Sequence, residues 1–162
     1  MGYEGPIYVT SVTELIGKDE QISATNYSAS AGLTLRNNTG AATSNASGEI
    51  LQVALYSYGG SELTNAGDLY LFDTDPAVAA NATALAEAGV EHKTLIGIVP
   101  VGVGDWVSDS YGAATLQTVS IPFQSLTTIY ASYRLATEST QFNSSSGDDE
   151  YLDMRLWYRR DG

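Results

Sequence analysis

The chain has 162 residues and a net charge of −12, from 19 acidic and 7 basic side chains, and it contains no cysteine. This length suits one domain that needs no covalent cross-link, and the lack of cysteine excludes a thiolate nucleophile, a zinc knuckle and a disulfide. The excess of carboxylates repels nucleic acid phosphates and anionic lipids, so we expect neither nucleic acid nor a membrane as a partner. Because no basic segment precedes an apolar run near the N-terminus, we expect no signal peptide.

Eight short segments have the composition of β-strands, because they are rich in Val, Ile, Thr and Tyr and many alternate between apolar and polar residues. Turn-forming stretches rich in Gly, Asn and Ser separate most of them. This pattern predicts a single all-β domain over residues 1–162, a β-sandwich or jelly-roll-like fold of about eight strands. The predicted strands are Ile7–Thr13, Gly32–Arg36, Glu49–Tyr58, Asp68–Phe72, Thr94–Val103, Ala114–Phe123, Thr127–Leu135 and Tyr151–Arg159.

Two further segments are predicted to have other structures. Residues 1–8 contain Gly5-Pro6, which disfavours regular structure, so we expect an extended N-terminal arm there. Residues 76–88 are rich in Ala, contain no Gly and precede Gly89, a residue type that commonly follows a helix end. The sequence therefore predicts one short helix over residues 76–88, inserted between two strands.

The acidic residues before this helix are the first candidate for catalysis. Asp73-Thr74-Asp75 follows an apolar strand and resembles the Asp-x-Asp of haloacid dehalogenase-type phosphotransferases, which holds a nucleophile, a general acid and Mg²⁺. That chemistry requires a parallel sheet and additional phosphate and metal ligands, which one helix among eight strands does not provide. Asp75 before Pro76 instead fits a helix N-cap followed by proline at the first helical position. We interpret Asp75 as a cap and Asp73 as a turn residue that accepts hydrogen bonds.

Three other motifs also lack the pattern that their chemistry requires. His92 is the only histidine, and no Gly-x-Ser-x-Gly elbow accompanies it. The sequence "GVGDW" at 102–106 lacks the spacing of a phosphate-binding loop and is interpreted as a bulged turn. Asp148-Asp149-Glu150 lacks the alternating acidic pattern of a calcium loop. We therefore predict no enzyme activity, no catalytic or metal-binding residue and no cofactor.

The C-terminal segment carries the strongest signal for a partner. As a strand it places Leu152, Met154, Leu156 and Tyr158 on one face, and Tyr151, Asp153, Arg155, Trp157 and Arg159 on the other. Three of the five arginines lie here beside a tryptophan, and Arg with Trp is the composition of interface anchors. In the alternative interpretation, the arginines only balance nearby carboxylates. The predicted interface residues are Arg155, Trp157, Arg159 and Arg160, with Tyr3 and Ile7 from the arm.

The succession of several segments over residues 66–160 resembles a known family. These are "GDLYLFDTDP", an Ala-rich helix, "KTLIGIVPV", "GDW", "IPF", "TIYASYRL" and "MRLWYRRDG". They are similar to the auxiliary head proteins of tailed double-stranded DNA viruses, the decoration or cement proteins that bind an assembled capsid. The resemblance implies a β-rich virion protein without catalytic residues, which binds the major capsid protein from the outside as a homodimer or homotrimer.

Two functions of other classes remain open. A carbohydrate-binding or adhesin-like β-sandwich would use loop aromatics, here Tyr58, Trp106 and Tyr111, to stack on sugar faces, although we expect Trp106 to be half-buried. A hydrolase would need a pair of carboxylates that face a cleft. The candidate pairs are Asp73/Asp75, Asp105/Asp109 and Asp148/Asp149.

Overall fold

The computed structural model describes residues 6–16, 21–22, 27–28, 30–36, 39–42, 45–58, 66–77, 94–108, 112–136, 140–141 and 151–161. The main strands are β1 (Ile7–Ile16), β3 (Ala31–Thr34), β4 (Ala46–Tyr58), β5 (Gly67–Phe72), β6 (Leu95–Val101), β8 (Gly112–Leu126), β9 (Thr128–Leu135) and β11 (Tyr151–Arg160). Three two-residue strands accompany them: β2 (Gln21–Ile22), β7 (Val107–Ser108) and β10 (Thr140–Gln141). Each main strand overlaps one predicted segment, and the all-β prediction is confirmed.

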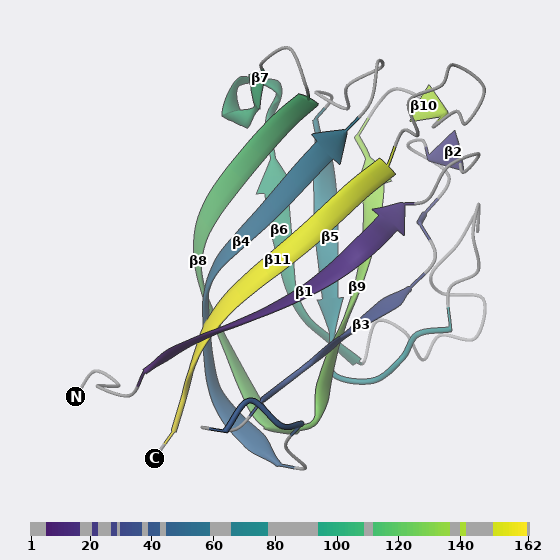
Figure 1. Ribbon diagram of the computed structural model, residues 1–162. Coiled ribbons are helices and arrows are strands. Elements are labelled where there is room, and N and C mark those ends of the chain that lie inside the picture. Colours follow the sequence, from purple (N-terminus) through teal and green to yellow (C-terminus); the bar gives the residue numbers. More distant parts are fainter. Residues whose placement is uncertain are drawn as a thin grey trace.

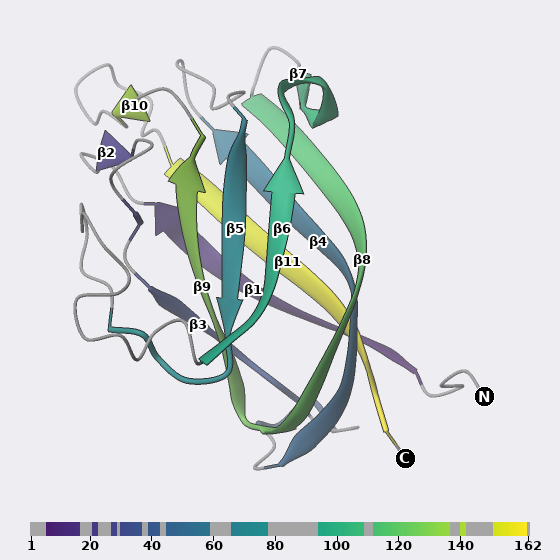
Figure 2. The same cartoon turned by 180° about the vertical axis from the view of Figure 1, so that it is seen from behind.

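The main strands form two antiparallel sheets with a nested order. The five-stranded sheet has the order β1-β11-β4-β8-β7, and the four-stranded sheet has the order β3-β9-β5-β6. The first main strand pairs with the last, β1 with β11, and moving inward β3 pairs with β9, β4 with β8, and β5 with β6. The chain thus resembles one long hairpin rolled into two layers, which is a jelly roll. Figure 1 shows the five-stranded sheet in front, and Figure 2 shows the four-stranded sheet.

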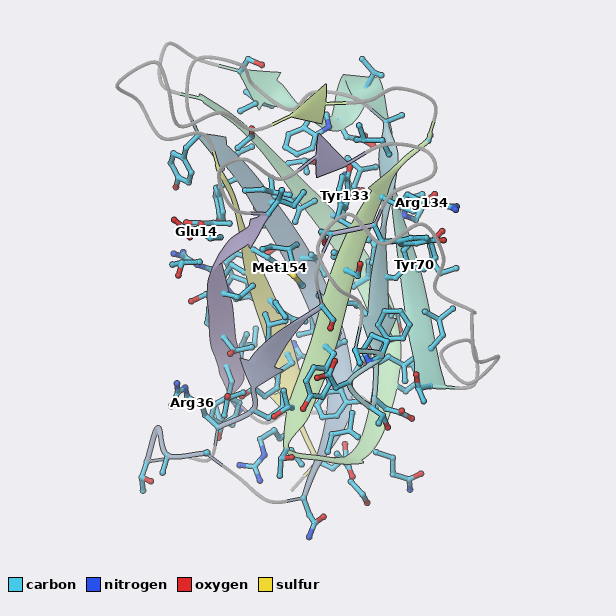
Figure 3. All side chains as sticks on the ribbon, turned by 90° about the vertical axis from the view of Figure 1, so that its right-hand side faces the viewer. Glu14, Arg36, Tyr70, Tyr133, Arg134 and Met154 are labelled. Carbon is cyan, nitrogen blue, oxygen red and sulfur yellow. The ribbon has the colours of Figure 1, made fainter. Side chains whose placement is uncertain are left out.

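One hydrophobic core fills the space between the sheets, because alternate residues of every main strand face inward. Figure 3 shows Met154 of β11 and Tyr133 of β9 between the two layers. At one end of the core, the Tyr158 ring stacks on Tyr8 with a centroid distance of 5.5 Å. The Tyr158 hydroxyl accepts the backbone N–H of Arg36 at 2.7 Å, so its polar end is satisfied.

A smaller apolar cluster lies on the outer face of the four-stranded sheet. Tyr70 and Phe72 of β5 point away from the main core, yet they are only 8% and 0% exposed because Tyr27 packs with them. Ser28 attaches the segment that carries Tyr27 to β9. The Ser28 N–H donates to the carbonyl of Tyr133, and the Ser28 hydroxyl accepts the N–H of Tyr133, both at 2.8 Å. The chain thus covers part of this sheet with its own residues.

Arg134 of β9 joins the two tyrosines of this cluster. Its guanidinium carbon lies 4.9 Å from the ring centroid of Tyr27 and 5.6 Å from that of Tyr70. Its Nη2 also donates a hydrogen bond to the Tyr70 hydroxyl at 2.9 Å. Figure 3 shows Arg134 and Tyr70 together on the outer side of the sheet. The cation–π contact with Tyr27 therefore binds the covering segment to the sheet, and the contacts with Tyr70 join β9 to β5 within it.

The predicted arm and the first predicted strand overlap at Ile7 and Tyr8. Both residues belong to β1, where they pair with Arg159 and Tyr158 of β11, as the predicted strand Ile7–Thr13 has them, and an arm before them stays a prediction. Pro6 has no backbone N–H, but the residues after it do, so they can form the backbone hydrogen bonds of a strand. Residues 1–5 lie outside the described residues. Within the described part of the chain, no helix is long and apolar enough to cross a membrane.

Candidate functional site: the outer face of the five-stranded sheet

The alternation predicted for β11 is confirmed. Leu152, Met154, Leu156 and Tyr158 are at most 1% exposed and belong to the core. On the opposite face, Arg155 is exposed and Trp157 and Arg159 are half-buried. A period of two residues follows from the pleat of the strand, so the outer residues form a line along β11.

β11 lies inside the sheet between β1 and β4, so its outer side chains have neighbours on both sides. Directly opposite residues in antiparallel strands point to the same face and contact each other. The rows therefore combine residues from four segments that are distant in sequence. One row is Val9, Trp157, Gln52 and Thr118, and the next is Ser11, Arg155, Ala54 and Leu116.

Large apolar side chains on this face are open to solvent. Ile7 is 54% exposed, Val9 45% and Leu116 56%, and Val107 of β7 is 76% exposed. Single exposed apolar residues are common on proteins, but several on one sheet face form a patch of the kind that marks an interaction site. We call this set the outer patch: Ile7, Val9, Tyr56, Val107, Leu116, Arg155 and Trp157.

Arg155 connects the two aromatic residues of the outer patch. Its guanidinium carbon lies 5.6 Å from the ring centroid of Tyr56 and 5.9 Å from that of Trp157. Two small hollows of about 160 Å³ each flank this arrangement, and both are lined by Tyr56 and Tyr58. Side chains of a partner can therefore fit into hollows beside the patch. The aromatic and Arg composition of the patch is typical of binding hot spots.

The structure brings together most, but not all, of the predicted interface residues. Arg159 and Ile7 are direct neighbours across β11 and β1. Arg160 instead lies at the end of the core: its guanidinium carbon is 5.8 Å from the ring of Tyr8, and Nη1 donates to the Arg36 carbonyl at 3.3 Å. The strand alternation that turns Arg159 outward turns its neighbour inward. The predicted Tyr3 lies outside the described residues.

Sequence reasoning missed four members of the patch: Val9, Tyr56, Leu116 and Val107. For two of them the sequence pattern was misleading, because Val9 and Leu116 face outward whereas the adjacent Thr10 and Thr115 are buried. Alternation of polarity alone would place the valine and the leucine in the core and the threonines outside. Val107 belongs to a two-residue strand, which carries no periodic signal.

The turn after β5 differs from the predicted helix start. Ala77 has a φ of 53°, which is left-handed and does not fit the second residue of an α-helix. Asp75 Oδ1 accepts the Ala77 N–H at 2.8 Å and the Ser30 hydroxyl at 2.9 Å, so Asp75 closes a local turn. The helix therefore does not begin at Pro76, and residues 78–88 lie outside the described residues. Asp73 accepts a hydrogen bond from Thr74 Oγ1, as expected for a turn residue.

The described residues of the remaining motifs do not form a site with one another. In the 3₁₀ turn over Val103–Asp105, Asp105 Oδ2 accepts the Gly102 N–H at 2.7 Å. Trp106 is only 8% exposed, so it offers no face to a sugar. Tyr58 is 37% exposed on the sheet face. His92, Asp109, Tyr111 and the acidic run 148–150 lie outside the described residues, and the described part of the chain holds no group of three potential metal-ligating side chains.

Three tyrosines have pKa values that the fold changes. Burial raises the pKa of Tyr133 in the core, and it also raises the pKa of Tyr158 and of Tyr70 on the covered outer face. Nearby Arg134 opposes the shift at Tyr70, because a positive charge favours the ionised phenol. These shifts report on structural burial rather than on an acid or base directed into a cleft.

No protein-family model matches the sequence, and the comparison with curated proteins finds no match. Among solved structures, the chain is similar to one in tomato aspermy virus, with 6% identity and a TM-score of 0.38, over 100% of this chain and 81% of the other. It is similar to a chain of Kashmir bee virus at acidic pH, with 12% identity and a TM-score of 0.35, over 98% and 71%. A chain of heated Israeli acute paralysis virus gives 12% identity and a TM-score of 0.33, over 98% and 72%. At these TM-scores the likeness assigns no family or function to this chain.

Proposed function

We propose that this chain is a structural protein of a virus particle, which binds the outer surface of the assembled capsid and stabilises it. The outer patch is the contact surface, and the partner is the major capsid protein. The single observation that carries the proposal is the exposure of Ile7, Val9, Leu116 and Val107 around Arg155 and Trp157 on one sheet face. Jelly rolls also occur widely in viral capsid proteins.

The chemistry of the patch favours a protein partner. Burial of its apolar side chains lowers the free energy of the complex, whereas Arg155 and the two aromatic rings fix the orientation of the partner. Nucleic acid is disfavoured by the net charge of −12. Modest affinity of each copy is sufficient to stabilise the shell, because many copies bind the same shell. We further propose that the chain acts as a homodimer or homotrimer, and by binding rather than by catalysis.

The test is co-sedimentation of the full chain with shells assembled from the major capsid protein of the same virus, followed by heating of the shells. Leu116→Asp and Val9→Asp place a charge in the outer patch at exposed positions, so the domain should fold normally. We expect each to weaken attachment by about tenfold or more, a loss typical of interface anchors. The wild type should raise the temperature at which the shells rupture.

Ile98→Asp is the matched control, because Ile98 is 48% exposed on the outer face of the other sheet. It changes the same type of residue by the same charge, and attachment should remain within about twofold of wild type. Equal losses in all three variants would point to a general charge effect, and unchanged attachment in the two patch variants would show that the outer patch is not the contact surface.

A further inference from the structure

A pocket of about 540 Å³ opens at the end of the sandwich where β4 begins and β8 and β11 end. This volume lies within the range of small-molecule sites, which is about 300–1,000 Å³. In the described part of the chain, four polar side chains line the pocket: Ser47, Asp73, Gln124 and Asp161. Ile96 and Pro122 contribute to its apolar wall. The lining is thus divided between polar and apolar groups.

The polar residues of the pocket are held in place by the fold. The Asp73 N–H donates to the Thr94 carbonyl, and the Asp161 N–H donates to the Ser47 carbonyl, both at 2.8 Å. Ser47 Oγ in turn accepts the N–H of Ser125 at 2.9 Å. These bonds fix the backbone from which Ser47, Asp73 and Asp161 project, on several sides of the pocket.

The lining restricts the chemistry of a ligand. Asp73 and Asp161 can only accept hydrogen bonds when ionised, and among the described residues no Lys or Arg lines the pocket. An anionic ligand would therefore be repelled, and a ligand rich in hydrogen-bond donors would be favoured. A single metal ion is far smaller than the pocket, and the described residues supply no group of three His, Cys, Asp or Glu side chains to hold one.

We propose that this pocket binds one sugar residue, either a neutral hexose or a hexosamine. Sugar hydroxyls donate to carboxylates in charge-assisted hydrogen bonds, and the C–H face of the ring packs on an apolar wall. The two described loop aromatics do not provide this site, because Trp106 is buried and Tyr58 lies on the sheet face. The proposal is independent of the outer patch, since the variants that test attachment leave every pocket residue unchanged.

Ligand-observed saturation-transfer NMR on the full chain tests the proposal, with glucose, galactose, mannose and glucosamine as probes and glucuronate and putrescine as contrasts. At least one hexose or glucosamine should receive saturation, and glucuronate should not. Asp161→Asn should lower the affinity by about tenfold, because it removes the charge that strengthens the hydrogen bonds. Gln124→Trp, at an exposed position, should fill the pocket and abolish binding.

Asp105→Asn is the matched control for the charge change, since Asp105 lies in the 3₁₀ turn outside the pocket, and it should bind as wild type does. Circular dichroism and thermal unfolding of each variant establish that it is folded. The proposal is wrong if no neutral hexose or glucosamine binds, or if both pocket variants bind normally. It is also wrong if glucuronate binds equally well, or if putrescine alone binds, which would indicate a cation site.

Discussion

The outer face of each sheet carries a cluster of one arginine and two aromatic rings, which is covered on one sheet and open on the other. On the four-stranded sheet, Arg134 contacts Tyr27 and Tyr70, and the chain segment that carries Tyr27 covers Tyr70. On the five-stranded sheet, Arg155 lies by Tyr56 and Trp157 at similar distances, but it is exposed. The first cluster is completed within the chain, whereas the second has the same composition and no cover among the described residues.

This difference separates stability from binding. Where the chain covers its own sheet, the arginine and its rings leave water during folding, so their contacts contribute to the free energy of unfolding. Where the face is open, the corresponding contacts gain most of their strength only when a partner excludes water. Matched substitutions in the two clusters should therefore give opposite results in unfolding and attachment experiments.

The largest effect on stability is expected for Arg134→Met. Methionine keeps much of the apolar stem but removes two cation–π contacts and the hydrogen bond to Tyr70, at a cost of about 2–3 kcal/mol in the free energy of unfolding. Urea denaturation followed by tyrosine and tryptophan fluorescence measures this cost. Arg155→Met is the matched control and should change stability by less than about 0.5 kcal/mol. Similar losses in both variants would mean that the covered and open clusters do not differ in the folded domain.

The next effect concerns attachment to capsid shells, where substitutions in the open cluster should cost more than those in the covered cluster. Trp157→Ala should weaken binding to capsid shells by about 2 kcal/mol, a value typical of an anchor residue. Arg155→Met should weaken it by about 1 kcal/mol, because the guanidinium loses its stacking at the interface. Attachment of Arg134→Met, measured where it is fully folded, should match wild type. Normal attachment of Trp157→Ala would place the contact surface elsewhere on the molecule.

The sequence predicted local structure well because alternation is a local property. All eight main strands were found, although β8 extends to Gly112–Leu126 beyond the predicted Ala114–Phe123. The added residues carry little apolar pattern of their own, and they are strand because they pair with the long β4. The outward phase of Arg155 and Trp157 was likewise predicted from the period of two residues alone.

Features that depend on contacts between distant segments were not predictable in this way. The nested strand order joins residues as far apart as Ile7 and Arg159, and no local signal encodes it. The pocket at the end of the sandwich combines Ser47, Asp73 and Asp161 from three separate segments. The left-handed Ala77 was also missed, because an Ala-rich sequence after Asp-Pro favours a helix unless tertiary contacts such as that of Asp75 with Ser30 compete.

The smallest expected effect distinguishes the core from the covered face by pH. Burial raises the pKa of Tyr133 and of Tyr70 above the ordinary value of 10, so below pH 10 both phenols are neutral in the folded and unfolded chain. Stability falls as the pH rises above 10, because the unfolded chain ionises first. The Tyr133 hydroxyl makes no hydrogen bond to the described residues, so Tyr133→Phe should keep or raise stability at pH 7, by at most about 1 kcal/mol. Tyr70→Phe should instead lower it by about 1 kcal/mol, because Arg134 loses its acceptor. Urea denaturation at pH 7 and pH 11 measures both, and Tyr133→Phe should lose less stability between these pH values than wild type. An equal loss would show that Tyr133 does not resist ionisation in the folded chain.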